Sequence, residues 1–221
     1  MTGGSRHGAL ALCAAVVLSG ASCGANDPVA SGESAATSAA SSQCLVRLHG
    51  KGGTGRAPVT AGDTTTVSPS GNADGWGGRQ WRYFPDEEYA GARDLVADAV
   101  SGCDRIIVNG FSNGGAFAAK LYCRGERFGG RLVRVVVDDP VVDAGVAECA
   151  PAADVEIVLY WTGGLEPTAA PGWDCAEGDW TCEGGTTIGI DAYAAALGTE
   201  VKQSRFDDHE WYWDAPEVSQ W

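Results

Sequence analysis

A serine between glycines is the residue of this chain best placed to do covalent chemistry. Ser112 lies in the segment 110–114 (GFSNG), after the apolar run 105–108 and before the small-residue segment 115–119. This order predicts a strand, a sharp turn with the serine at its tip, and a helix. The flanking glycines avoid collisions with the strand and the helix. Because the N–H groups that begin the helix point toward the serine, they can stabilise an oxyanion formed there.

The histidines that could activate this serine are His7, His49 and His209. His7 lies in the N-terminal leader or the arm that follows it. His209 follows the last predicted strand and can reach the carboxyl edge of the sheet, so we predict that it is the general base. His49 ends the first predicted strand, before the glycine-rich turn 50–53. That turn suits the second half of an oxyanion hole, and His49 either orders the turn or takes a direct role.

The base needs a carboxylate to hold its tautomer and stabilise the imidazolium. Glu166, at the exit of the fifth predicted strand, is the preferred candidate because a turn there would aim its side chain toward His209. Asp179 is the alternative acid, and the neighbours of His209 are poorly placed because adjacent side chains on an extended segment point apart. Three further aspartates follow the fourth predicted strand: Asp138, Asp139 and Asp143. We interpret them as a solvated strand end or a weak calcium site.

The elements that must position these residues alternate between apolar runs and helical patterns. Strands are predicted at 45–48, 64–67, 105–108, 132–137, 155–161 and 201–206, and helices at 85–100 and 191–197. This alternation is typical of a mostly parallel sheet with crossover helices. We therefore predict an α/β fold in which a mostly parallel central sheet carries helices on both faces. The site is expected at the carboxyl ends of the strands.

The N-terminal region predicts export. Basic residues precede the apolar run 9–18 and small residues up to Cys23, so residues 1–23 are typical of an export signal. The sequence before Cys23 resembles a bacterial lipoprotein processing site, which predicts either a lipid anchor at the outer face of the cell membrane or simple secretion. Residues 24–42 are Ser/Ala-rich and have too few large apolar side chains to fold. Residues 43–221 have the size of one domain.

Six cysteines lie within this predicted domain. An even number in an exported chain indicates three disulfides. Many pairings are open from sequence alone, but two of the cysteines each precede a predicted strand and two others would close a short loop, which leaves the last two to pair. The expected pairs are Cys44 with Cys103, Cys175 with Cys182, and Cys123 with Cys149. The spacings do not suggest zinc, and we expect no metal or organic cofactor.

Charge and aromatic content bear on the partner. The formal net charge of −14 argues against nucleic acid or an anionic membrane surface as the main partner. We expect a monomer that acts on a small-molecule, lipid or polymer ester. Tryptophans on loops near the serine could contact aromatic, acyl or carbohydrate-linked groups, or they could pack the core. These are Trp161, Trp173, Trp180, Trp211 and Trp213.

From Gln43 onward, the sequence resembles the α/β-hydrolase superfamily. Leu48-His49-Gly50, the 110–114 elbow, Gly163-x-x-Glu166-Pro167 and His209 occur in the order found in its carboxylesterase, dienelactone hydrolase and polyhydroxyalkanoate depolymerase branches. The resemblance implies a triad of Ser112, Glu166 and His209. It also implies oxyanion donors at the backbone N–H groups of Asn113 and of Lys51 or Gly52.

A narrower resemblance concerns the cysteines. Cutinases have a cysteine before each of the two strands that Cys44 and Cys103 precede here, and they place a catalytic aspartate in a C-x-x-x-D-x-x-C loop. The segment 175–182 has that spacing, which implies Asp179 as the catalytic acid. Both resemblances imply an exported serine esterase that forms an acyl-enzyme. The alternatives are an inactive binding or surface-interaction module and a serine peptidase of the same fold.

Overall fold

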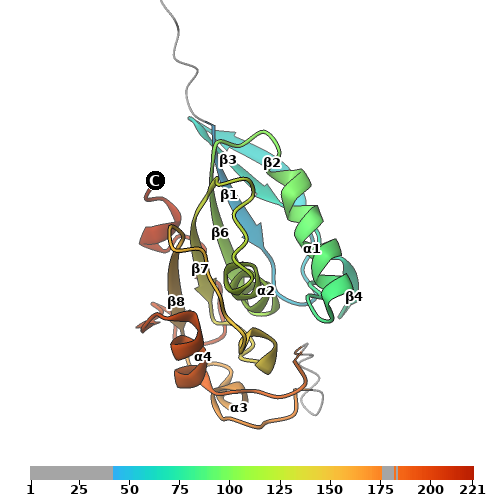
Figure 1. The fold of residues 1–221 in the computed structure, drawn as a ribbon, viewed down its shortest axis with the longest axis vertical. Coiled ribbons are helices and arrows are strands. Elements are labelled where there is room, and N and C mark those ends of the chain that lie inside the picture. The colour runs from blue at the N-terminus through green and yellow to red at the C-terminus, as the bar shows by residue number, and fades with distance from the viewer. Residues whose placement is uncertain (1–41, 176–181, 183) are drawn as a thin grey trace, which may run out of the picture. The chain divides into compact units, whose positions relative to one another are not determined.

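The computed structural model describes residues 42–175, 182 and 184–221. Their central element is a seven-stranded sheet (Figure 1). The strand order is β2-β3-β1-β6-β7-β8-β9, and every neighbouring pair is parallel except β2 with β3. The strands are β1 (Gln43–Leu48), β2 (Arg56–Ala61), β3 (Thr64–Ser68), β6 (Arg105–Phe111), β7 (Leu132–Asp138), β8 (Glu156–Trp161) and β9 (Val201–Gln203). The predicted mostly parallel sheet is therefore confirmed.

Each predicted strand is present, and the structure adds elements that the sequence did not predict. These are the antiparallel edge strand β2 and the hairpin of β4 (Ala73–Gly75) and β5 (Gly78–Gln80). The predicted export signal, Cys23 and nearly all of the predicted linker lie outside the described residues. Export and lipidation therefore stay predictions. The described residues contain no helix long and apolar enough to cross a membrane.

The two faces of the sheet are covered differently. Because side chains alternate along a strand, Val46, Val108 and Leu159 face one side, where they pack with the helices in the larger core cluster. We call this side the helix face, and Figure 1 shows α1 and α2 on it. The helices are α1 (Asp86–Ala99), α2 (Asn113–Cys123), the short α3 (Glu166–Ala169) and α4 (Ile190–Leu197).

The opposite side, which we call the C-terminal face, carries a smaller cluster that includes Leu45, Ile107 and Val136. Residues of the segment 211–221 cover this cluster, and the only helical turn there within the described chain is the 3₁₀ helix η2 (Pro216–Val218). The prediction of helices on both faces thus holds in a limited form. Part of the C-terminal face is left without a helical cover.

Polar contacts fasten the C-terminal segment to the sheet. Arg134 on β7 donates to the backbone oxygens of Glu217 at 2.8 Å and Gln220 at 2.6 Å. The Glu217 carboxylate accepts from the Tyr160 hydroxyl at 2.6 Å and from Lys202 at 2.6 Å. The segment that carries His209 is therefore held at both ends, by β9 before it and by these contacts after it.

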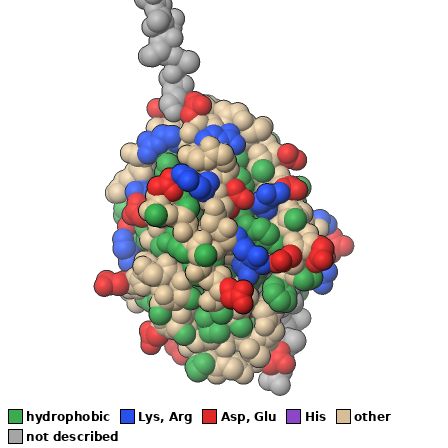
Figure 2. All heavy atoms as spheres, in the orientation of Figure 1, with side chains coloured by type: hydrophobic (Ala, Val, Ile, Leu, Met, Phe, Trp, Pro, Cys, Tyr) green, Lys and Arg blue, Asp and Glu red, His purple; other side chains and the backbone are tan. Residues whose placement is uncertain are grey.

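The first helix follows from local sequence. Pro85 and three acids open α1, where acidic side chains interact favourably with the helix dipole. Its buried side chains are Ala92 and Val96, which face the sheet. All eleven residues of α2 are buried, which explains its small side chains. On the face shown in Figure 2, acidic and basic side chains are interspersed.

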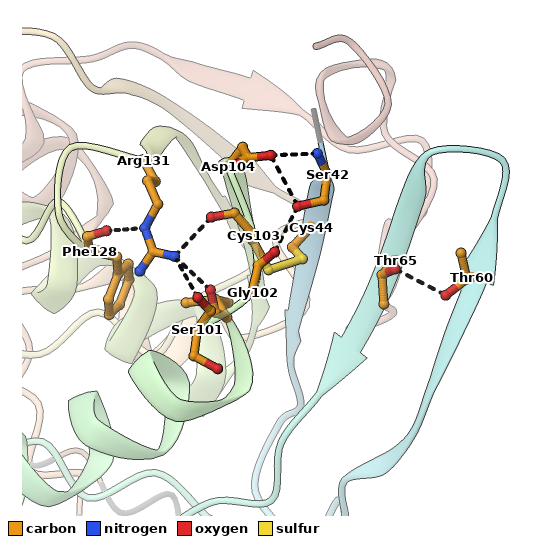
Figure 3. The surroundings of a disulfide bond; sticks show 11 residues. Ser42, Cys44, Thr60, Thr65, Ser101, Gly102, Cys103, Asp104, Phe128 and Arg131 are labelled. Carbon is orange, nitrogen blue, oxygen red and sulfur yellow. Dashed lines mark hydrogen bonds between the residues drawn. A yellow bond between two sulfur atoms is a disulfide. The ribbon is translucent and has the colours of Figure 1, made fainter. Parts of the chain in front are cut away.

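The cysteines pair as predicted: Cys44 with Cys103, Cys123 with Cys149, and Cys175 with Cys182. Figure 3 shows that the first disulfide joins the start of β1 to the loop before β6. Beside it, the Asp104 carboxylate accepts from the backbone N–H of Ser42 at 2.8 Å, and Arg131 donates to the Cys103 carbonyl at 2.8 Å. These contacts fix the amino ends of the two strands that lead to the site.

Candidate active site

The serine occupies the turn that the sequence predicts. Ser112 lies between the end of β6 and the start of α2, and its φ of 53° lies in the left-handed region that residues other than glycine rarely adopt. A Cβ atom at Gly110 would lie 2.2 Å from the Gly114 carbonyl oxygen, and one at Gly114 would lie 2.3 Å from the carbonyl oxygen of Leu48. Only glycine fits at these two positions, so the strand, turn and helix pattern is confirmed.

His209 follows β9 at the same carboxyl edge, and three elements hold it. Its Nδ1 atom forms a hydrogen bond with the Asp139 carboxylate. Its ring stacks on Phe111, the residue before Ser112, with ring centroids 4.6 Å apart. The loop after β8 packs against its backbone so closely that a Cβ atom at Gly164 would lie 2.5 Å from the His209 nitrogen.

Asp139 is the carboxylate that the structure places against His209. It directly follows β7, the strand beside β6, and its φ of 42° turns the chain at the strand end. The residue is fully buried, at 0% exposure, and its Oδ1 accepts from the backbone N–H of Thr162 at 3.2 Å. One carboxylate oxygen is thus held by the β8 loop while the other faces the histidine ring.

The structure does not place Glu166, the acid preferred from the sequence, against His209 Nδ1. Glu166 is exposed at the start of α3, and the structure gives the Nδ1 position to Asp139 instead. Asp179 lies outside the described residues. The sequence argument failed because it judged Asp139 by its neighbours along the chain. The left-handed turn at the strand end, which aims the side chain across the sheet edge, has no clear sequence signature.

The interpretation of the acidic group as a solvated strand end or calcium site is also wrong. Asp138, Asp139 and Asp143 are all 0% exposed. Asp138 accepts from the Tyr212 backbone N–H at 2.5 Å, and Asp143 binds the Tyr83 hydroxyl and the Gly145 N–H. Within the described residues, no three acidic, histidine or cysteine side chains are arranged to hold a metal ion. Burial, with a further effect of the Asp139 charge, raises the pKa of Asp138 to about 7.

The glycine-rich turn after β1 lies beside the serine. A Cβ atom at Gly50 would lie 3.2 Å from Ser112 Cβ. The Gly52 N–H donates to the Arg79 carbonyl of the β4–β5 hairpin at 2.9 Å. Because this N–H group already has an acceptor, we no longer consider Gly52 an oxyanion donor. The candidate donors are then the backbone N–H groups of Asn113, at the start of α2, and Lys51.

His49 orders this turn, in agreement with one of its two sequence readings. Its Nε2 accepts from the Gly71 N–H at 3.1 Å, so Nδ1 carries the proton and donates to the Gly50 carbonyl at 2.7 Å. Burial lowers the pKa of His49, which favours this neutral form. Because both ring nitrogens are engaged, the structure leaves His209 as the candidate base.

Asn113 has a positioning role that the sequence did not reveal. Its side-chain oxygen accepts from the Trp81 N–H at 2.7 Å, and its amide nitrogen donates to the Trp81 carbonyl at 3.1 Å. The Trp81 indole in turn donates to the His49 carbonyl at 3.1 Å. The start of α2 and the turn after β1 are therefore tied together through one buried tryptophan, which fixes the two candidate oxyanion donors relative to each other.

A groove of about 720 Å³ opens on the C-terminal face beside the turn after β1. Trp211 and Trp213 line it, as does Phe111, whose ring is stacked on Trp211 with centroids 5.8 Å apart. Of the other tryptophans expected near the serine, Trp161 is buried and Trp173 packs against the core, whereas Trp180 lies outside the described residues. The groove thus gives two of these five residues a position beside the site.

Comparisons with known proteins give structural matches only. No protein-family model matches the chain, and no curated protein matches its sequence. A carboxylesterase from Bacillus cereus is 17% identical, with a TM-score of 0.48 over 80% of this chain and 84% of that one. Acyl-protein thioesterase 2 from Zea mays is 16% identical, with a TM-score of 0.46 over 82% and 90%. The structure of YahD with malic acid is 15% identical, with a TM-score of 0.48 over 80% and 89%.

Proposed function

We propose that this chain, which has an α/β-hydrolase fold, is a serine esterase that cleaves carboxylic esters through an acyl-enzyme intermediate. The observation that carries the proposal is the pair formed by the buried Asp139 and the half-buried His209 at the carboxyl edge of the sheet, beside a serine on a strained turn. A structural histidine needs no fully buried carboxylate behind it. A general base does, because the carboxylate fixes its tautomer and stabilises the charge that it gains.

The proposed reaction begins when Ser112 Oγ attacks the ester carbonyl carbon. His209 accepts the serine proton at Nε2, since its Nδ1 faces Asp139, and the imidazolium is stabilised by the Asp139 carboxylate. The tetrahedral oxyanion is held by the N–H groups of Asn113 and Lys51, each contributing about 3 kcal/mol to transition-state stabilisation. His209 then gives its proton to the departing alcohol, which leaves the acyl group on Ser112.

Water completes the cycle. His209 takes a proton from a water molecule as that water attacks the acyl-enzyme carbonyl, and it returns the proton to Ser112 when the acid product leaves. The same three side chains could also cleave an amide, as a serine peptidase does. The ester is proposed because an amide is stabilised by resonance and an alkoxide is a better leaving group than an amide anion, so ester cleavage requires less of the site.

The test is labelling of the purified protein with a fluorophosphonate, read by intact mass, together with hydrolysis of 4-nitrophenyl butyrate. We expect one label per chain in the wild type and none in Ser112→Ala or His209→Ala. The matched control is Ser219→Ala, which removes an exposed serine far from the elbow in sequence. A folded protein that neither takes the label nor cleaves the ester would refute the proposal and favour a binding module. Cleavage of peptide amides in preference to esters would indicate a peptidase.

A further inference from the structure

The groove on the C-terminal face carries positive charge, although the chain as a whole is acidic. Arg47, Lys51 and Arg56 line it together with the three aromatic residues Phe111, Trp211 and Trp213. The net charge of the chain is −14, so a cationic lining in this place is a local departure from the overall composition. Its volume is within the range of sites that take small organic ligands.

The two arginines of the groove form no ion pair with acidic side chains of the described residues. Within the described chain, Arg47 makes no ion pair, and its Nε atom is buried without a hydrogen-bond partner. Its guanidinium instead lies over the Trp213 ring, 5.2 Å from the centroid. The nearby carboxylate of Asp214 pairs with Arg205 at 2.7 Å. Burial and the charge of Arg56 lower the pKa of Arg47, and the charge of Asp214 offsets only part of this effect, so a half-buried arginine lies near an exposed one of the same charge.

Strand geometry explains why these side chains meet. Arg47 lies on β1 and alternates with the buried Val46 and Leu48, so it points to the C-terminal face. Arg56 lies on β2 opposite Ser68 of β3, which also lines the groove. No described helix covers this part of the face, and the C-terminal segment places Trp213 beside Arg47. The half-buried Arg47 and the exposed Arg56 therefore both lie at the groove, and Trp213 packs beside Arg47.

The groove also adjoins the candidate active site. Its wall includes Gly50 and Phe111, and a Cβ atom at Gly50 would lie 3.2 Å from both the Phe111 ring and Ser112 Cβ. We propose that the groove binds an anionic group of the substrate, so that the preferred esters carry a carboxylate or another acidic group joined to the scissile ester by an apolar or aromatic spacer. This inference rests on the proposed esterase function.

The chemistry of the lining supports this assignment. An acidic group can accept hydrogen bonds from two guanidinium groups at once, which would offset their mutual repulsion. The spacer would pack on the rings of Trp211 and Trp213. Without such a groove, an acidic protein repels an anionic ester, and neutral esters would be cleaved faster. A preference for the anionic ester is thus a specific outcome.

The experiment compares matched esters in the full protein. One pair has the charge on the acyl side: 4-nitrophenyl hydrogen adipate and 4-nitrophenyl methyl adipate. The other has it on the alcohol side: 4-acetoxybenzoate and methyl 4-acetoxybenzoate. We expect kcat/KM to favour the anionic member of at least one pair by 10-fold or more, on the order expected for charge-assisted hydrogen bonds. In Arg47→Gln/Arg56→Gln the ratio of kcat/KM for the anionic ester to kcat/KM for its neutral partner should fall to about one or below.

Controls separate the groove from net charge and from folding. Arg93→Gln/Arg127→Gln removes the same charge from two ion-paired surface residues and should keep the preference. Arg56→Gln alone changes an exposed side chain and should reduce the preference even if loss of Arg47 destabilises the fold. The proposal is overturned if neither pair shows a preference in a protein that cleaves neutral esters, or if the preference survives in the groove variants.

A failure of the esterase function gives a different result. In that case no ester is cleaved and the fluorophosphonate does not label Ser112. The groove is then tested directly by NMR titration of the tryptophan indole N–H signals with 4-acetamidobenzoate and with its neutral methyl ester. Binding of the anion alone, lost in Arg47→Gln/Arg56→Gln, supports the anion site without turnover. Equal binding of both compounds, or of neither, refutes it.

Discussion

Replacement of Asp139 by asparagine should abolish most of the activity, for a reason that the structure makes specific. In the wild type, Asp139 Oδ1 accepts from the Thr162 N–H and Oδ2 faces His209 Nδ1. In the variant, the amide oxygen keeps the contact with Thr162, because an NH₂ group there would face another donor. The NH₂ group then faces Nδ1, which must accept, and the proton moves to Nε2. A histidine protonated at Nε2 cannot take the proton of Ser112.

The expected loss is large because Asp139 is fully buried and no water can replace its charge. We expect kcat/KM for 4-nitrophenyl butyrate to fall by about 10³-fold or more, or about 4 kcal/mol at roughly 1.4 kcal/mol per tenfold. Glu166→Gln, in which the exposed side chain loses its charge, should stay within about threefold of the wild type. Urea unfolding of each variant checks the fold. The reasoning fails if Asp139→Asn keeps more than a tenth of the activity, or if Glu166→Gln loses as much.

Two further predictions concern stability. The pKa of Asp138 is about 7 in the folded protein against 3.8 as the ordinary value, so the folded state binds more protons between these limits and loses stability as the pH rises from 4 to 7. Asp138→Asn should remove this loss, so the variant should be more stable than the wild type at pH 8 by on the order of 2–4 kcal/mol but not at pH 4. Urea unfolding at the two pH values measures this difference in stability. Equal stabilities of the variant and the wild type at pH 8 would contradict the prediction. Gly114→Ala should destabilise by several kcal/mol, because its Cβ would lie 2.3 Å from the Leu48 carbonyl oxygen. Gly91→Ala on α1 has open space around the new Cβ and should stabilise by about 0.5–1 kcal/mol, so thermal unfolding of both variants tests whether close approach is what matters.

The sequence predicted the elements whose signals are local. The apolar runs gave the central strands, and Pro85 with its acids gave the start of α1. Strand β2 was missed because all six of its residues are exposed, so that no alternation of apolar and polar residues marks it. The turn at Ser112 was predicted because Gly110 and Gly114 flank the serine, and glycine is required where backbone segments come this close.

The sequence pointed to one candidate residue where a residue type had a single good position, and it left several candidates where more positions were available. His209 was the candidate base because the chain has few histidines. Asp139 was not chosen as the acid, because its role depends on β7 lying beside β6 and on a left-handed turn at the strand end. The sequence did not predict the hairpin of β4 and β5, and for this reason it left Gly52 as a candidate oxyanion donor. In the structure, the Gly52 N–H group donates to the Arg79 carbonyl of that hairpin. In both cases the deciding contact joins residues far apart in the sequence.

The backbone conformations of Ser112 and Asp139 bear on how the protein can change. Both residues have positive φ angles, 53° and 42°, at the ends of adjacent strands. Each such conformation costs on the order of 1–3 kcal/mol in a residue other than glycine. Glycine at either position would relax the backbone and remove a side chain that the proposed reaction uses. Selection for a more stable chain and selection for an active one therefore act in opposite directions at these two positions, so descendants that lost the activity would be expected to gain glycine there first.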